Sequence, residues 1–131
     1  MSAGGANYRD ESRIEHMYRA AVRIREKLGG LTRAAMAEGQ DATEVILYNV
    51  QLIGEAANNI GSAFCEKHPE IDFAGWAGLR HKLVHDYANI DLDIVWNALM
   101  MDFPKLEMAL KRIVDSLPPS PPLPENIDEF E

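Results

Sequence analysis

The sequence predicts an all-α protein, an up-and-down bundle of four to five helices. Apolar side chains recur at helical spacing, and no stretch shows the two-residue alternation or the Asn-Gly and Asp-Gly turns of hairpins. The expected helices are joined by a few residues only, which favours antiparallel neighbours. With 131 residues, 47% of them hydrophobic, the chain can bury one core. We expect the bundle at 10–116, after a flexible N-terminus (1–9) and before a Pro-rich, acidic, disordered tail (117–131).

The first helix is expected to run from the capping acceptors that begin at Asp10 to the glycines that end at Gly30. Arg19, Arg23 and Lys27 stand one turn apart on its polar side, which usually marks a solvated face and only sometimes an anion-binding stripe. Residues 1–33 carry seven basic and four acidic side chains, whereas the whole chain has a formal net charge of -8. This acidic balance argues against indiscriminate nucleic-acid binding, because phosphate contacts need a surplus of Lys and Arg.

A short helical connector with Thr32 as its cap should follow, and then a long central helix. Asp41 and Glu44 have the spacing of a capping box, and an apolar stripe continues from there to Lys67. Glu55 lies within that stripe, so the pattern predicts a buried carboxylate that needs a partner.

The third helix is expected at about 73–87. Pro69 ends the preceding helix, because proline disfavours helical backbone in the residue before it. A fourth helix should be capped at Asp91, and Pro104 either kinks it or begins a fifth.

The third helix carries the densest chemistry of the chain, at 79–87. Its core-facing stripe would consist of Trp76, Leu79, Leu83 and Tyr87, with Arg80 at the edge. On an ideal helix His85 lies about 140° around the axis and roughly 7.5 Å along it from Arg80. One helix therefore cannot easily direct both side chains at one atom, whereas two copies related by a twofold axis can.

A shared Arg and His cleft suits RNA cleavage without a metal or a cofactor. The 2′-hydroxyl is the nucleophile, one imidazole accepts its proton, another protonates the leaving 5′-oxygen, and Arg80 stabilises the transition-state charge. Three other interpretations of these residues stay open. The His and Arg side chains can be plain surface, Arg80 and Glu55 can form a structural ion pair, and His81 with His85 has the spacing of two zinc ligands, which is weak evidence alone.

The motif Arg80-x-x-x-x-His85-x-Tyr87 resembles that of the HepT-like toxins, a family of the HEPN superfamily. The segment Ile53-Gly54-Glu55-Ala56-Ala57 is similar to the Ile-Gly-Glu-Ala segment of that family, and the similarity continues through Pro69-x-Ile71 and from Leu83 to Trp96. Together it covers about residues 10–116. The chain departs from the family pattern at His81, where Asn is usual, and at Phe73, where Trp is usual.

The resemblance implies a homodimeric, metal-independent ribonuclease toxin with an MntA-type nucleotidyltransferase as its antitoxin. Arg80 and His85 would be catalytic, His81 a polar helper, and Glu55 a residue that pairs with or orients Arg80. Tyr87 would be the acceptor of AMP, whose bulk and negative charge would exclude an RNA phosphate from the cleft. The RNA substrate would be a tRNA or an mRNA.

A different class of function also fits: a catalytically silent module that binds a nucleotide or a protein partner through the same helix. The N-terminus lacks the pattern of a secretion signal and no apolar run reaches the length of a membrane span, so we expect a cytoplasmic protein. The single cysteine, Cys65, cannot form an intrachain disulfide and needs no special role.

Overall fold

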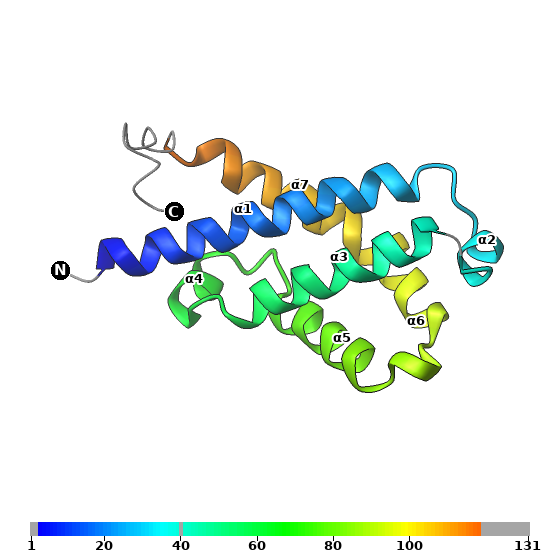
Figure 1. Ribbon diagram of the computed structural model, residues 1–131. Helices are drawn as coiled ribbons and strands as arrows, with labels where there is room; N and C mark the ends of the chain where they lie inside the picture. The colour runs from blue at the N-terminus through cyan, green and yellow to red at the C-terminus, as the bar shows by residue number, and fades with distance from the viewer. Residues whose placement is uncertain (1–2, 40, 119–131) are drawn as a thin grey trace, which may run out of the picture.

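The regular structure is helical throughout the described part of the chain (Figure 1). The computed structural model describes residues 3–39 and 41–118, with the side chains of 3–8 and Tyr87 left out. Its elements are α1 (Ala3–Leu28), α2 (Arg33–Ala37), α3 (Asp41–Asn58), α4 (Ser62–Lys67), α5 (Phe73–His85), η1 (Tyr87–Asn89), α6 (Leu92–Asn97), η2 (Ala98–Asp102) and α7 (Phe103–Ser116). The predicted all-α class is confirmed.

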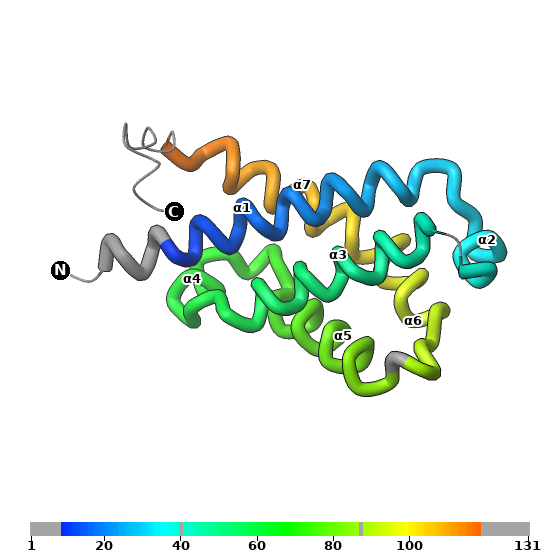
Figure 2. The backbone as a smooth tube through the Cα atoms, in the orientation of Figure 1, coloured from blue at the N-terminus to red at the C-terminus, as the bar shows by residue number. Residues whose placement is uncertain are grey.

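The four longest helices, α1, α3, α5 and α7, alternate in direction and form the bundle (Figure 1). The tube in Figure 2 follows the same path: α3 lies between α1 and α5, and α7 packs back along α1. The helices bury one apolar core, whose largest fully buried side chains include Ile14, Met17, Ile24, Ile46, Ile53, Leu99 and Leu110. The predicted up-and-down bundle is therefore correct, and α3 is the helix that connects the two sides of the molecule.

α1 begins at Ala3, before the capping position predicted at Asp10. Asp10 lies inside the helix, only 8% exposed. One of its carboxylate oxygens accepts a hydrogen bond from the Gly61 N–H at 3.0 Å and lies 3.7 Å from the Arg13 guanidinium. The local sequence pattern cannot distinguish an acidic helix cap from an acidic side chain inside a helix that binds another segment. In both cases the carboxylate accepts hydrogen bonds from backbone N–H groups. The residues 1, 2 and 119–131, which include most of the predicted tail, lie outside the described part.

The central helix ends at Asn58, so the predicted continuation to Lys67 is wrong. The Asn59 side chain donates to the Glu55 carbonyl at 2.9 Å, which occupies a backbone acceptor of the last turn. The chain then bends through Gly61, whose N–H is held by Asp10, and restarts as α4. The apolar pattern continues through this break because α4 also packs against the core.

Two helix caps and the place of a proline follow their local signals closely. The Thr32 hydroxyl accepts from Ala35 N–H at 3.0 Å and the Asp91 carboxylate accepts from Asp93 N–H at 2.9 Å, which confirms both predicted caps. A turn of π-helix, η2, joins α6 to α7. Pro104 then stands in the first turn of α7, where its missing N–H costs least. No described helix combines the length and the apolar character that crossing a membrane requires.

Candidate active site

The helix α5 is fixed to the bundle by its cap and by one apolar face. The Asp72 carboxylate accepts from the Gly75 N–H at 2.9 Å and so begins the helix. Trp76, Leu79 and Leu83 are 5%, 9% and 2% exposed, as predicted for the core-facing stripe. α5 ends at His85, two residues before the predicted end, so the backbone of Tyr87 belongs to the following 3₁₀ turn, η1.

Arg80 is half-buried where α5 crosses α3. A Cβ atom added at Gly54 would collide with the Arg80 Cβ and would lie 2.7 Å from the Trp76 carbonyl oxygen. The glycine therefore lets the two backbones approach until the stem of Arg80 is held against α3. Within the described residues no hydrogen bond or ion pair occupies the Arg80 guanidinium. The result is an arginine with a fixed stem and a free head group.

His81 and His85 form a pair on the exposed side of α5. Their ring centroids lie 4.1 Å apart, with 52° between the ring planes. Both side chains are exposed, as is Val84 beside them, at 48%. A single chain therefore presents two imidazoles and an apolar side chain on the exposed side of α5, at one, five and four positions after Arg80.

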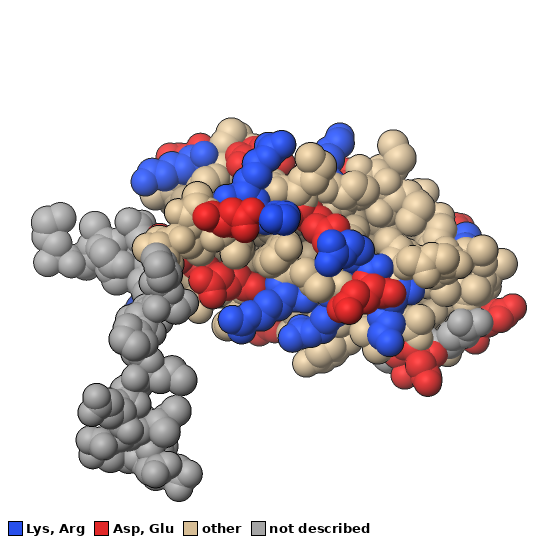
Figure 3. Space-filling view, turned by 90° about the horizontal axis from the view of Figure 1, so that it is seen from above, with Lys and Arg blue, Asp and Glu red and all other residues tan. Residues whose placement is uncertain are grey.

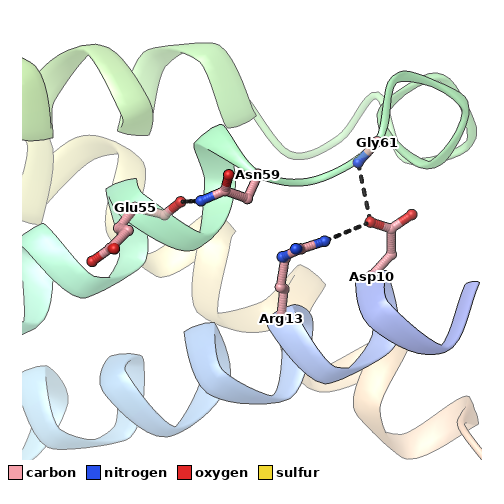
Figure 4. A network of polar contacts seen from close by, with 5 residues as sticks. All are labelled: Asp10, Arg13, Glu55, Asn59 and Gly61. Carbon is pink, nitrogen blue, oxygen red and sulfur yellow. Dashed lines mark hydrogen bonds and ion pairs between the residues drawn. The ribbon is translucent and has the colours of Figure 1, made fainter. Parts of the chain in front are cut away.

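The predicted burial of Glu55 is wrong, because this side chain is exposed. Among the described residues no ion pair joins it to Arg80. In Figure 4 the Glu55 carboxylate points along α3, away from the Arg13 guanidinium, which is directed at Asp10. The apolar pattern gave the wrong prediction for Glu55 because the outward face of α3 lies between α1 and α5 and stays open to solvent.

Metal and thiol chemistry find little support near this helix. The part of the chain that the structure describes holds no group of three or more His, Cys, Asp or Glu side chains that could bind a metal ion.

The lone thiol, Cys65, lies on α4. Its partial burial and, to a smaller extent, the nearby charge of Asp10 raise its pKa. Since the thiolate is the nucleophilic form, Cys65 is a poor nucleophile at neutral pH.

Grooves formed by the described residues lie along the bundle, and the two considered next contain neither Arg80 nor His85. One, of about 550 Å³, lies between α5 and the α6–α7 segment, with Trp76 and Met101 among its lining residues. The other, of about 360 Å³, lies between α1 and α3. Four side chains from α1 line it: Arg13, His16, Arg19 and Arg23.

Of the α1 side chains that line this second groove, the sequence pattern named only Arg19 and Arg23. Arg13 and His16 were missed because they fall outside the four-residue spacing that defines a charged stripe. Basic and acidic side chains are mixed on the surface seen from above the bundle, with several basic ones close together (Figure 3). The distribution of charged side chains on the surface therefore does not identify the groove, whereas its concave surface does.

These features define a class: helical-bundle proteins that carry an arginine and a histidine, five positions apart, on one helix. The chain belongs to the ribonuclease HepT-like family, whose model matches residues 17–113. The predicted resemblance to HepT-like proteins is confirmed.

The names of similar proteins agree with this family assignment. A proposed RNase of Caldanaerobacter subterraneus subsp. tengcongensis is 28% identical over 101 residues, which are 77% of this chain and 90% of the relative. A probable ribonuclease HepT of Thermococcus cleftensis is 32% identical over 68 residues, 52% of this chain and 62% of that protein. A proposed RNase of Methanocaldococcus jannaschii is 34% identical over 68 residues, 52% of this chain and 59% of the relative. No solved structure gives a significant match.

Proposed function

We propose that this protein is a metal-independent endoribonuclease, the toxin of a toxin–antitoxin pair, which acts in the cytoplasm as a homodimer. The observation that carries the proposal is the Arg80 guanidinium, which Gly54 fixes at its stem and which no described residue pairs with at its head, on the same helix as the His81 and His85 pair. The family membership and the names of the relatives support ribonuclease chemistry for this helix.

The geometry of one helix supports the homodimer. Arg80 and His85 point about 140° apart on α5, so a second copy is needed to complete one site. The exposed Val84 next to His85 gives that face an apolar contact. Because Glu55 directly follows Gly54, it stays a candidate for orienting an Arg80 guanidinium in the assembled dimer.

The proposed reaction is transfer of the phosphodiester to the neighbouring 2′-oxygen. One His85 accepts the 2′-hydroxyl proton as the oxygen attacks phosphorus, and the other His85 donates a proton to the departing 5′-oxygen. Arg80 stabilises the charge that builds on the phosphoryl oxygens. His81, in ring contact with His85, orients it. The products are a 2′,3′-cyclic phosphate and a 5′-hydroxyl.

The first test is RNA cleavage in excess EDTA by protein purified without a polyhistidine tag, on tRNA and mRNA. We expect cleavage to persist, and the new ends to be 2′,3′-cyclic phosphates, because the nucleophile is part of the RNA and no metal-bound water takes part. Cleavage that requires Mg²⁺, or that leaves 3′-hydroxyl ends, would contradict this mechanism. Protein that leaves every RNA intact would instead favour a module that binds a nucleotide or a partner.

We further propose that a nucleotidyltransferase of the MntA type switches the toxin off by transferring AMP to the Tyr87 hydroxyl, with release of pyrophosphate from ATP. Tyr87 stands two residues after the end of α5, so an adenylate there would add bulk and negative charge beside the cleft. We expect mass spectrometry of protein treated with such a transferase and ATP to find one or more AMP groups on Tyr87. Tyr48, which is 62% exposed, serves as the internal control and should stay unmodified. AMP on Tyr48, or on neither, would count against the switch.

A further inference from the structure

The groove between α1 and α3 lies outside the proposed catalytic helix and is rich in positive charge. Three guanidinium groups from α1, those of Arg13, Arg19 and Arg23, line it together with His16. From α3 it is lined by Leu52, Ala56 and one carboxylate, that of Glu55. Three cations against one acidic side chain make a concave surface that attracts anions, on a chain that is acidic as a whole.

Each arginine of this groove contacts one protein partner, and Arg13 lies 3.7 Å from the buried Asp10 carboxylate. Arg23 donates to the neutral Asn49 side chain at 3.2 Å. Arg19 lies 3.8 Å from the Glu15 carboxylate, and its side chain is 64% exposed. Ion pairs this long and this exposed contribute little. The Arg19 guanidinium can therefore turn toward an anionic ligand at small cost, and Arg23 keeps donors that its bond to Asn49 does not use.

The shape of the groove fits a phosphodiester chain better than a single phosphate. Arg13 and Arg23 are ten residues apart on one helix, which places them about 15 Å apart along its axis. Tyr48 lies one turn before Leu52 on α3, next to the Asn49 that Arg23 contacts, and is 62% exposed. Tyr48 does not line the groove itself but stands one turn beyond Leu52, and a basic groove with an exposed aromatic ring nearby is a common arrangement for binding single-stranded nucleic acid.

The groove also lies close to the proposed catalytic residues. α3 separates α1 from α5, and axes of packed helices are about 8–10 Å apart. Gly54, which contacts Arg80, directly precedes the Glu55 that lines the groove. We infer that the α1–α3 groove binds the sugar–phosphate backbone of single-stranded RNA, with one base stacked on Tyr48, and that it leads the strand toward Arg80. This inference rests on the proposed ribonuclease function.

The experiment measures the affinity of the His85→Ala protein for a fluorescein-labelled oligouridine by fluorescence anisotropy over a range of salt concentrations. In that background we expect Arg19→Gln with Arg23→Gln to weaken binding about tenfold and to lower the slope of log K against log salt by about 1.4. Glutamine at position 23 keeps a donor for Asn49. Arg112→Gln, at an exposed position on α7, removes the same kind of charge and should change neither quantity.

Tyr48 is tested in the same assay. Tyr48→Ala should weaken binding about 5- to 100-fold without changing the salt slope, whereas Tyr48→Phe should bind as tightly as the parent. An RNA duplex of equal length should bind more weakly than the single strand. If both strand forms bind alike and Tyr48→Ala has no effect, the stacking contact is absent, and an acidic protein segment becomes the better occupant of the groove.

Failure of this inference can be told apart from failure of the ribonuclease proposal. A double arginine variant with unchanged affinity and salt slope overturns the groove assignment, even if the wild-type protein cleaves RNA. Oligouridine binding that depends on Arg19, in a wild-type protein that cleaves no RNA, supports the groove and overturns the ribonuclease. If the double variant fails to fold by circular dichroism, Arg19→Gln alone decides the question, with an expected loss of about 0.7 in slope.

Discussion

Replacing His85 with alanine is expected to lower the rate of RNA cleavage by about 10²- to 10⁴-fold, because the variant loses both proton transfers of the proposed reaction. Arg80→Ala should cost about 10²- to 10³-fold, since the variant loses the guanidinium that stabilises the charge on the phosphoryl oxygens in the proposed reaction. Initial rates on one labelled RNA in EDTA, at fixed protein concentration, measure both effects. Neither side chain is part of the core, so the thermal unfolding of both variants should stay close to that of the wild type.

Two further variants separate loss of chemistry from loss of charge. Lys82→Ala removes an exposed cation two positions from Arg80, on another side of α5, and should keep activity within about twofold of the wild type. Arg80→Lys keeps the charge but loses the planar, two-pronged donor, so it should recover only part of the activity. If Lys82→Ala is as damaging as Arg80→Ala, the helix contributes general positive charge and the specific role of Arg80 is wrong.

The same variants test whether two copies share one cleft. A mixed dimer of Arg80→Ala and His85→Ala chains keeps one arginine and one histidine, on different copies. If the site takes these groups from opposite copies, the mixed dimer keeps Arg80 and one of the two proton transfers, so random exchange should give a mixture that is more active than either single variant but has less than a quarter of the wild-type activity. An inactive mixture, in which exchange is verified by mass, would contradict the shared cleft.

The parts of the fold that the sequence predicts well depend on local chemistry. The Thr32 and Asp91 caps, the break before α5 and the place of Pro104 each follow from a few neighbouring residues. The core-facing stripe of α5 is equally local, because helical geometry alone puts Trp76 and Leu83 on one face.

The features that sequence reasoning missed depend on contacts between distant residues. α3 ends at Asn58 because Asp10, on another helix, binds the backbone that follows it. Glu55 lies in an apolar pattern, but a helical wheel does not tell which sides of α3 are covered by α1 and α5. The α1–α3 groove is likewise invisible in the sequence, since its arginines are ordinary until α3 closes one side of it.

Gly54→Ala is expected to destabilise the protein by about 3 kcal/mol, the effect of overpacking at a close helix crossing. The added methyl group would meet the Arg80 Cβ and lie 2.7 Å from the Trp76 carbonyl oxygen. Neither atom belongs to the free end of a side chain, so the methyl group can be accommodated only if α5 moves away from α3. Urea denaturation measures the loss in the free energy of unfolding. Because the clash displaces Arg80 itself, the folded fraction should also cleave RNA more slowly than the wild type.

Gly78→Ala on the neighbouring helix is the matched control, since it makes the same substitution at a helical glycine with different surroundings. A Cβ at Gly78 has no atom within 4 Å. Alanine there should stabilise the protein by up to about 1 kcal/mol, through its higher helix propensity. If the free energy of unfolding falls for Gly54→Ala and rises for Gly78→Ala, the close approach of α3 and α5, and not glycine content, holds Arg80 in place. A Gly54→Ala protein as stable and as active as the wild type would show that the crossing is looser than this geometry, and would remove the reason given for the fixed stem of Arg80.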